Sequence, residues 1–228
     1  MILKLGLLIF SFFLAFFSYQ RKLVDKSALI FILFFAVYFI FLFPIYFFIS
    51  LLILYSLTNI ATRYKIEQKK IYHKKGREIK NLLSNLLVAI IFSFIYLIYP
   101  HQVFYFAFLC SLGCACADTL SSEIGQLSRK NPRLITTLEE VKTGTEGGIS
   151  ILGLFFGLIG SLLVALPSIY FGIYMFFTIV VVGFIGCNID SIIGAKFELA
   201  GKCTNETTNL VATLSAGILG LVVFAFLI

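Results

Sequence analysis

The chain has 228 residues, of which 60% are hydrophobic and 13% are charged, and its mean hydropathy is +1.03. Soluble domains carry about 25% charged residues, and here the apolar residues fall in long blocks, so a soluble globular protein is excluded. The net charge of +7 could indicate a nucleic-acid partner, but the basic residues flank apolar segments, where they orient a chain in a bilayer. We therefore expect the membrane bilayer, and no nucleic acid, among its partners.

The apolar segments, taken in chain order, predict an all-α polytopic transmembrane helix bundle of about eight spans. Residues 2–19 form a first span rather than a signal peptide, because Lys4 is their only leading charge and no small-x-small cleavage site follows. As one helix, residues 27–61 would be roughly 50 Å long, against a hydrocarbon core of about 30 Å. Pro44 near the middle therefore predicts two spans, at 27–43 and 45–61. The remaining spans are expected at 81–99, 102–121, 149–166, 169–193 and 209–226.

Four polar segments separate these spans, at 20–26, 63–80, 123–148 and 196–208. With eight spans, all four fall on one face of the membrane and hold 17 of the 18 lysines and arginines. This asymmetry predicts that the face is cytoplasmic, with both termini outside. Seven spans, with 27–61 as one of them, are the alternative.

We accordingly expect residues 1–228 to form a single integral membrane domain, multi-pass in the cell membrane, with an active face on the cytoplasmic side. Its cytoplasmic loops are expected at about 62–80, 123–148 and 196–208. A homo-oligomer is possible.

Cysteines and glycines within the spans are interpreted as packing residues. The pair Cys114 and Cys116 would point its side chains about 200° apart on a helix, which makes a poor metal site. Gly153 and Gly157 form a Gly-x-x-x-Gly pair, with Gly160 next along, and this spacing is typical of close helix packing.

Three acids mark the candidate chemistry. Asp118 and Asp190 lie near the cytoplasmic ends of their spans, and Glu123 follows the first of them. A carboxylate within a membrane costs roughly 2.5–3.5 kcal/mol at the centre of a helix, so these acids need partners. Mg²⁺ binds carboxylate and phosphate oxygens, so we predict Asp118, Glu123 and Asp190 as metal ligands and catalytic residues. On a straight helix, Asp118 and Glu123 would lie about 140° apart, too far around the helix to bind one ion by themselves. Asp190, from another span, could supply the further ligand. A hydrogen-bond network between helices is the alternative.

A glycine-rich loop at residues 136–150 leads directly into a span and predicts a phosphate site. Glycine N–H groups and a helix N-terminus favour an anion. Lys142 is predicted as a further catalytic residue, whose positive charge would neutralise negative charge on the phosphates. The predicted phosphate-binding residues of the loop are Thr143, Gly144, Thr145, Gly147, Gly148 and Ser150. A flexible loop with an ordinary glycine-rich helix entry is the alternative.

A second phosphate-binding element is predicted at the start of the span 81–99. Arg77 could clamp a phosphate and Asn85 lies close behind it in the sequence. An arginine beside lipid headgroups is also typical of a simple anchor.

At these positions the sequence resembles the integral membrane family of uncharacterised-domain proteins that includes phytyl-phosphate kinase and transmembrane protein 19. The blocks that carry the resemblance are 117–125 (ADTLSSEIG), 134–137 (LITT), 144–150 (GTEGGIS), 190–195 (DSIIGA) and the Gly-Arg…Asn pattern of 76–85. Residues 208–211 weakly resemble a further block of this family, of the type Asn-x-x-Val-Asn. The second asparagine of that block is replaced here by Ala212.

The resemblance implies a lipid-phosphate kinase. Such an enzyme would transfer a phosphoryl group from a nucleoside triphosphate (CTP, UTP or ATP) to an isoprenoid lipid phosphate, such as phytyl or geranylgeranyl phosphate, with Mg²⁺ as cofactor. A prenol kinase and a lipid-phosphate cytidylyltransferase are alternatives that would use the same groups. A membrane transporter is the alternative from another class, since intramembrane aspartates and interrupted helices also mark transport sites.

Overall fold

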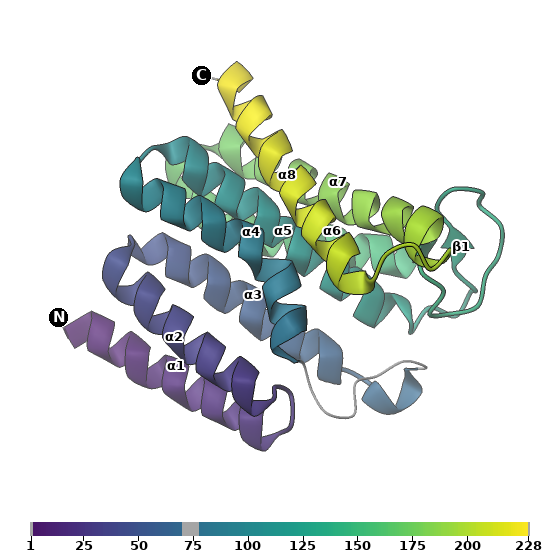
Figure 1. Ribbon diagram of the computed structural model, residues 1–228, viewed down its shortest axis with the longest axis horizontal. Helices are drawn as coiled ribbons and strands as arrows, with labels where there is room; N and C mark the ends of the chain where they lie inside the picture. Colours follow the sequence, from purple (N-terminus) through teal and green to yellow (C-terminus); the bar gives the residue numbers. More distant parts are fainter. Residues whose placement is uncertain (1, 70–77, 228) are drawn as a thin grey trace.

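The computed structural model describes residues 2–69 and 78–227, and within them the chain forms a bundle of eight α-helices (Figure 1). The helices are α1 (Ile2–Gln20), α2 (Lys26–Leu42), α3 (Ile45–Arg63), α4 (Ile79–Ile98), α5 (Gln102–Gly125), α6 (Ile151–Ala165), α7 (Ile173–Ile193) and α8 (Asn205–Leu227). Short 3-10 turns follow α3 and α6, as η1 (Ile66–Gln68) and η2 (Leu166–Phe171), and α7 continues into a π-helical turn, η3 (Gly194–Glu198).

Seven of the helices in the described part of the chain are long and apolar enough to cross a membrane, and α2, with 17 residues, is a shorter apolar helix. The predicted polytopic helix bundle is therefore confirmed. The stretch 27–61 does not form one helix, because Phe43 leaves α2 in an extended conformation and α3 begins after Pro44. Proline cannot donate the backbone hydrogen bond that would carry α2 onward.

The helices alternate in direction, so the polar segments gather at one end of the bundle (Figure 1). The N- and C-termini lie at the opposite end from the loop that carries β1. This arrangement agrees with the grouping of basic segments expected for eight spans. The side of the membrane that the polar end faces stays a prediction.

Helix α5 forms the centre of the bundle. It packs against α3, α4, α6, α7 and α8, and 83% of its most apolar stretch is buried. Small side chains allow this: Gly153, Gly157 and Gly160 of α6 lie close to backbone atoms of α5. Cys110 and Cys114, also in α5, are buried free thiols, as expected of packing residues.

Two features differ from the expected pattern. Helix α5 continues to Gly125, so Glu123 lies in its last helical turn and not in a loop. The segment after α5 also contains two short antiparallel strands, β1 (Arg133–Leu134) and β2 (Gly148–Ile149), which pair an earlier part of that segment with its end.

The crossing of α5 and α7 gives a prediction about stability. A methyl group added at Gly183 would meet Ser161 Oγ and would lie 2.9 Å from the backbone carbon of Gly113. We expect Gly183→Ala to lower the free energy of unfolding by about 1–3 kcal/mol through overpacking. Gly6→Ala is the matched control, because its added methyl group meets nothing within 4 Å and alanine favours a helix. Thermal unfolding in detergent would contradict this reasoning if both variants behaved alike.

Candidate active site

A polar cavity of about 470 Å³ opens at the end of the bundle where the polar segments gather. Its walls come from α4, α5, α7, α8 and the loop before α6. The structure brings most of the predicted site residues to this cavity, namely Asn85, Asp118, Glu123, Thr143, Gly144, Thr145, Gly147, Gly148, Ser150 and Asp190. Residues that are up to 105 positions apart in the sequence therefore meet at one place.

Two acids from different helices meet in this cavity. Asp118 lies in the last third of α5 and Asp190 lies near the end of α7. The two carboxyl groups interact through their side chains, and Asp190 is only 9% exposed. Like charges at such close range are unfavourable unless a proton or a cation neutralises them. The pair is thus suited to hold a metal ion.

Three buried acceptor oxygens on the cavity wall have no hydrogen-bond partner among the described residues. They are Asp190 Oδ2, Asn85 Oδ1 and Asn209 Oδ1. The amide nitrogens of both asparagines are already used, since Asn85 Nδ2 donates to Asn81 O at 2.9 Å and Asn209 Nδ2 to Asn205 Oδ1 at 3.2 Å. A buried acceptor without a donor costs about 1–3 kcal/mol.

These oxygens have the chemistry of a site for a hard cation. Mg²⁺ is bound by one or two carboxylates, and waters and substrate phosphates complete its octahedral shell. Asp118 and Asp190 can supply the carboxylates, and Asn85 and Asn209 can supply amide oxygens. No group of three His, Cys, Asp or Glu side chains suited to a metal occurs in residues 2–69 and 78–227. A metal held by the two aspartates would therefore need other protein ligands, such as the two amide oxygens, or waters and phosphates.

Asn209 is absent from the residues predicted from sequence. The departure at Ala212 argued against the block that contains it, yet its side chain is 6% exposed and lines the cavity. The spacing of Asn205 and Asn209, one helical turn apart at the start of an apolar span, was the signal that could have identified it.

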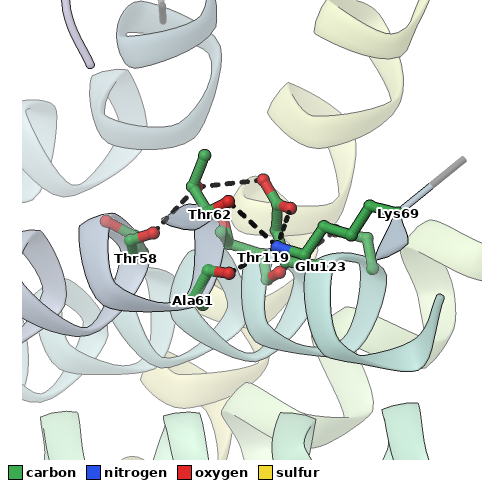
Figure 2. A network of polar contacts seen from close by, with 7 residues as sticks. Thr58, Ala61, Thr62, Lys69, Thr119 and Glu123 are labelled. Carbon is green, nitrogen blue, oxygen red and sulfur yellow. Dashed lines mark hydrogen bonds and ion pairs between the residues drawn. The ribbon is translucent and has the colours of Figure 1, made fainter. Parts of the chain in front are cut away.

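Glu123 lies on the cavity wall, but its carboxylate is already occupied. Lys69 Nζ forms an ion pair with Glu123 Oε2 at 2.8 Å, and Thr62 Oγ1 donates to Glu123 Oε1 at 2.9 Å. Figure 2 shows these contacts, with the Lys69 ammonium between Glu123 and the end of α3. The structure therefore does not join Glu123 to the pair formed by Asp118 and Asp190.

Lys69 also caps α3. Its ammonium group donates to Ala61 O and to Thr62 O, at 3.0 Å for Thr62, and these are carbonyls of the last helical turn (Figure 2). Terminal carbonyls lack partners within a helix, and a cation there interacts favourably with the helix dipole. The side chain of Lys69 is fully buried, so the segment after α3 is fixed to α5 at the edge of the cavity.

Of the two predicted cations, the structure describes only Lys142. Lys142 is exposed and does not line the cavity, and Arg77 lies outside the described residues. Lys80 does line the cavity, where it contacts Glu78 at 3.4 Å and Glu206 at 3.7 Å.

The cavity is strongly acidic. Partial burial raises the pKa of Glu146, another residue of the cavity wall, and the negative charge of Glu198 raises that pKa further. A cation that entered the cavity would have the opposite effect and favour the ionised form. The electrostatics therefore favour a divalent cation together with an anionic ligand over a bare anion.

The glycine-rich loop is held by packing as well as by its shape. Gly147 adopts a φ of +73°, and a methyl group there would overlap Ala195 and lie 2.6 Å from Ser191 O. Ser150 caps α6, because its hydroxyl accepts from Gly153 N at 3.1 Å. The loop thus rests on the end of α7, close behind Asp190.

This close approach gives a second prediction about stability. We expect Gly147→Ala to destabilise the protein by more than Gly201→Ala. Both glycines have positive φ, so both variants carry about 1–2 kcal/mol of backbone strain, but Gly201 has open space around it. Thermal unfolding of the two variants measures the difference, and equal midpoints would show that the loop does not pack tightly on α7.

The fold and the cavity define a polytopic helical membrane protein with an acid-lined polar site at one end of its bundle. The chain belongs to the integral membrane protein family DUF92, whose model matches residues 9–222, which confirms the resemblance of the sequence blocks. No solved structure matches it.

Several curated proteins are similar to the chain. An uncharacterized membrane protein of Methanocaldococcus jannaschii, MJ0933, is 37% identical over 187 residues, which cover 78% of this chain and 76% of that protein. Two Arabidopsis thaliana proteins match shorter stretches. Protein PGR is 36% identical over 40% of the chain and 36% of its own length, and Protein VTE6, chloroplastic, is 38% identical over 31% of the chain and 21% of its own length.

Proposed function

We propose that this protein is an isoprenyl-phosphate kinase, which transfers a phosphoryl group from a nucleoside triphosphate to a prenyl monophosphate. The observation that carries the proposal is the cavity that places Asp118 and Asp190 beside unpartnered amide oxygens and the glycine-rich loop. The resemblance of these same blocks to the family that includes phytyl-phosphate kinase supports the choice of reaction.

Asp118 and Asp190 would hold Mg²⁺, with the amide oxygens of Asn85 and Asn209 as further ligands. Bound Mg²⁺ would supply positive charge to the phosphate oxygens of the nucleotide. The acidic wall needs that charge, because Lys80 is the single Lys or Arg among the described residues that line the cavity.

The loop residues would orient the nucleotide. Thr143 and Thr145 offer hydroxyl groups at the cavity wall, and Gly144 offers backbone with no side chain in the way. Positioning of this kind, together with electrostatic stabilisation, supplies most of the catalysis of phosphoryl transfer.

In the proposed reaction, an oxygen of the prenyl phosphate attacks the γ-phosphorus. The bond between that phosphorus and the bridging oxygen breaks, and the nucleoside diphosphate leaves with the electron pair. The attacking oxygen already carries negative charge, so no strong general base is required. The described lining of the cavity contains no histidine, in keeping with this requirement.

The alternatives make different demands on the site. A prenol kinase needs a base for the hydroxyl group, and Asp118 or Asp190 would serve. A lipid-phosphate cytidylyltransferase would release pyrophosphate from CTP. The described acids of the cavity lie at the ends of helices and in the loops that join them, which favours an enzyme at the membrane surface over a transporter.

We further propose that the cavity faces the cytoplasm of a cell-membrane protein, since the polar segments of the sequence hold nearly all the lysines and arginines. Nucleotide and Mg²⁺ would then be available on that side.

Rival acceptors test the proposal. Purified protein would be incubated with Mg²⁺, each of CTP, UTP and ATP, and either geranylgeraniol or geranylgeranyl monophosphate. The proposal expects the diphosphate from the monophosphate and no product from the alcohol. Product from the alcohol alone would show a prenol kinase, pyrophosphate release a cytidylyltransferase, and counterflow in proteoliposomes without nucleotide a transporter.

A further inference from the structure

A second cavity, of about 110 Å³, lies inside the bundle next to the polar one. Helices α1 to α5 line it, and its walls are almost entirely apolar, with Phe31, Phe35, Leu52 and Leu86 among them. The mechanism proposed above makes no use of this space.

The two cavities adjoin and share part of their walls. Asn81 and Asn85 of α4 and Thr119 of α5 line both of them. On α5, Ala115 faces the apolar cavity one turn deeper than Thr119. A molecule that occupied both spaces would therefore have a polar end beside Asn85 and an apolar part that runs into the bundle.

The size of the apolar cavity limits what it can hold. An engineered apolar cavity of about 150 Å³ binds benzene, so 110 Å³ suits roughly five carbons. The two acyl chains of a phospholipid are too large for this space. Its lining on α3 runs from Phe48 to Thr58, roughly 15 Å along the helix axis, which directs a single chain away from the polar end.

We propose that the apolar cavity holds the isoprene unit next to the phosphate group of the substrate. The head group then lies in the polar cavity, and the rest of a long chain continues between the helices towards the lipid. This inference rests on the proposed function for the identity of the head group. The inference assigns recognition of the first isoprene unit to the apolar cavity. Recognition there should not depend on the total length of the prenyl chain.

A filled cavity tests the inference. Ala36 lines the apolar cavity and is 8% exposed, whereas its neighbour Val37 is 45% exposed on the outer face of α2. We expect Ala36→Phe to raise the KM for prenyl monophosphates at least tenfold. The factor should be similar for a short substrate, geranyl phosphate, and a long one, geranylgeranyl phosphate. The KM for the nucleotide should not change. Val37→Phe is the matched control and should leave both constants unchanged. Equal effects of the two variants, or no effect of Ala36→Phe, would overturn the inference.

A labelling experiment separates this inference from the proposed function and covers the case in which Ala36→Phe does not fold. Wild-type protein with Mg²⁺ and no nucleotide would be irradiated with a prenyl monophosphate that carries a diazirine on its first isoprene unit. We expect label on Phe35, Leu52 or Leu86. Label there without any kinase turnover would support the cavity and overturn the kinase. Diphosphate formation with label only on α6 or α7, or with no label, would overturn the cavity assignment and leave the kinase standing.

Discussion

Asp190→Asn is expected to abolish phosphoryl transfer, with a loss on the order of 10³-fold or more. The amide keeps the shape of the side chain, but it removes one of the two carboxylates that the proposal assigns to Mg²⁺. Asp190 is buried against Asp118, so the substitution also removes an interaction between like charges. In the absence of metal, the variant should therefore be at least as stable as the wild type.

This combination of lost activity and retained stability distinguishes a ligand from a structural residue. Mg²⁺ should raise the unfolding temperature of the wild type, because a ligand that binds only the folded state stabilises it, and the Asp190→Asn variant should lose that increase. Glu140→Gln is the control, since Glu140 is an exposed acid at the same end of the bundle that pairs only with Arg133 in the structure described. Wild-type turnover in Asp190→Asn would contradict the role of this carboxylate.

Lys69→Met is expected to cost about 3–5 kcal/mol of stability. The substitution keeps the length of the side chain but leaves the Glu123 carboxylate, which is 13% exposed, without its cation. It also removes the donor to the last carbonyls of α3. Thermal or denaturant unfolding in detergent measures the loss.

A double-mutant cycle isolates the ion pair from the cap. Glu123→Gln retains an acceptor oxygen for Thr62 and should cost less than Lys69→Met, because it leaves an ammonium that still has carbonyl partners. The double variant should be more stable than the sum of the two losses predicts, since neither charge then remains unpaired. Additive losses would show that the two charges do not interact. Turnover per folded molecule should fall modestly in Glu123→Gln, which separates it from Asp190→Asn.

The fold could be predicted from the sequence because a membrane restricts what a chain can do. Backbone groups in lipid must be satisfied within each segment, so long apolar stretches form helices. Pro44 divided the stretch 27–61 because the proline ring acts locally, and the basic segments fixed which ends lie together. The end of α5 was harder to place, since the polar residues Ser122 and Glu123 continue the helix: both line the cavity, and Glu123 also contacts Thr62 of α3.

The candidate site could be predicted only in part. Asp118 and Asp190 stand out because each is an acid at the edge of an apolar span, and the loop stands out through its glycines. The pairing of Glu123 with Lys69 joins residues 54 positions apart, and no local pattern indicates which cation a carboxylate will meet. The spacing of Asn205 and Asn209 could indicate a polar position on α8, but it does not show that α8 packs beside α4 or that the amide oxygen of Asn209 lacks a donor among the described residues.

The most direct test of the central claim is transfer of the terminal phosphate itself. Purified protein would receive geranylgeranyl monophosphate, Mg²⁺ and a nucleoside triphosphate labelled at the γ-phosphate. We predict labelled geranylgeranyl diphosphate, lost with a chelator and lost in Asp190→Asn. No labelled diphosphate with CTP, UTP or ATP, from folded protein that Mg²⁺ still stabilises, would contradict the kinase while leaving the metal site in place.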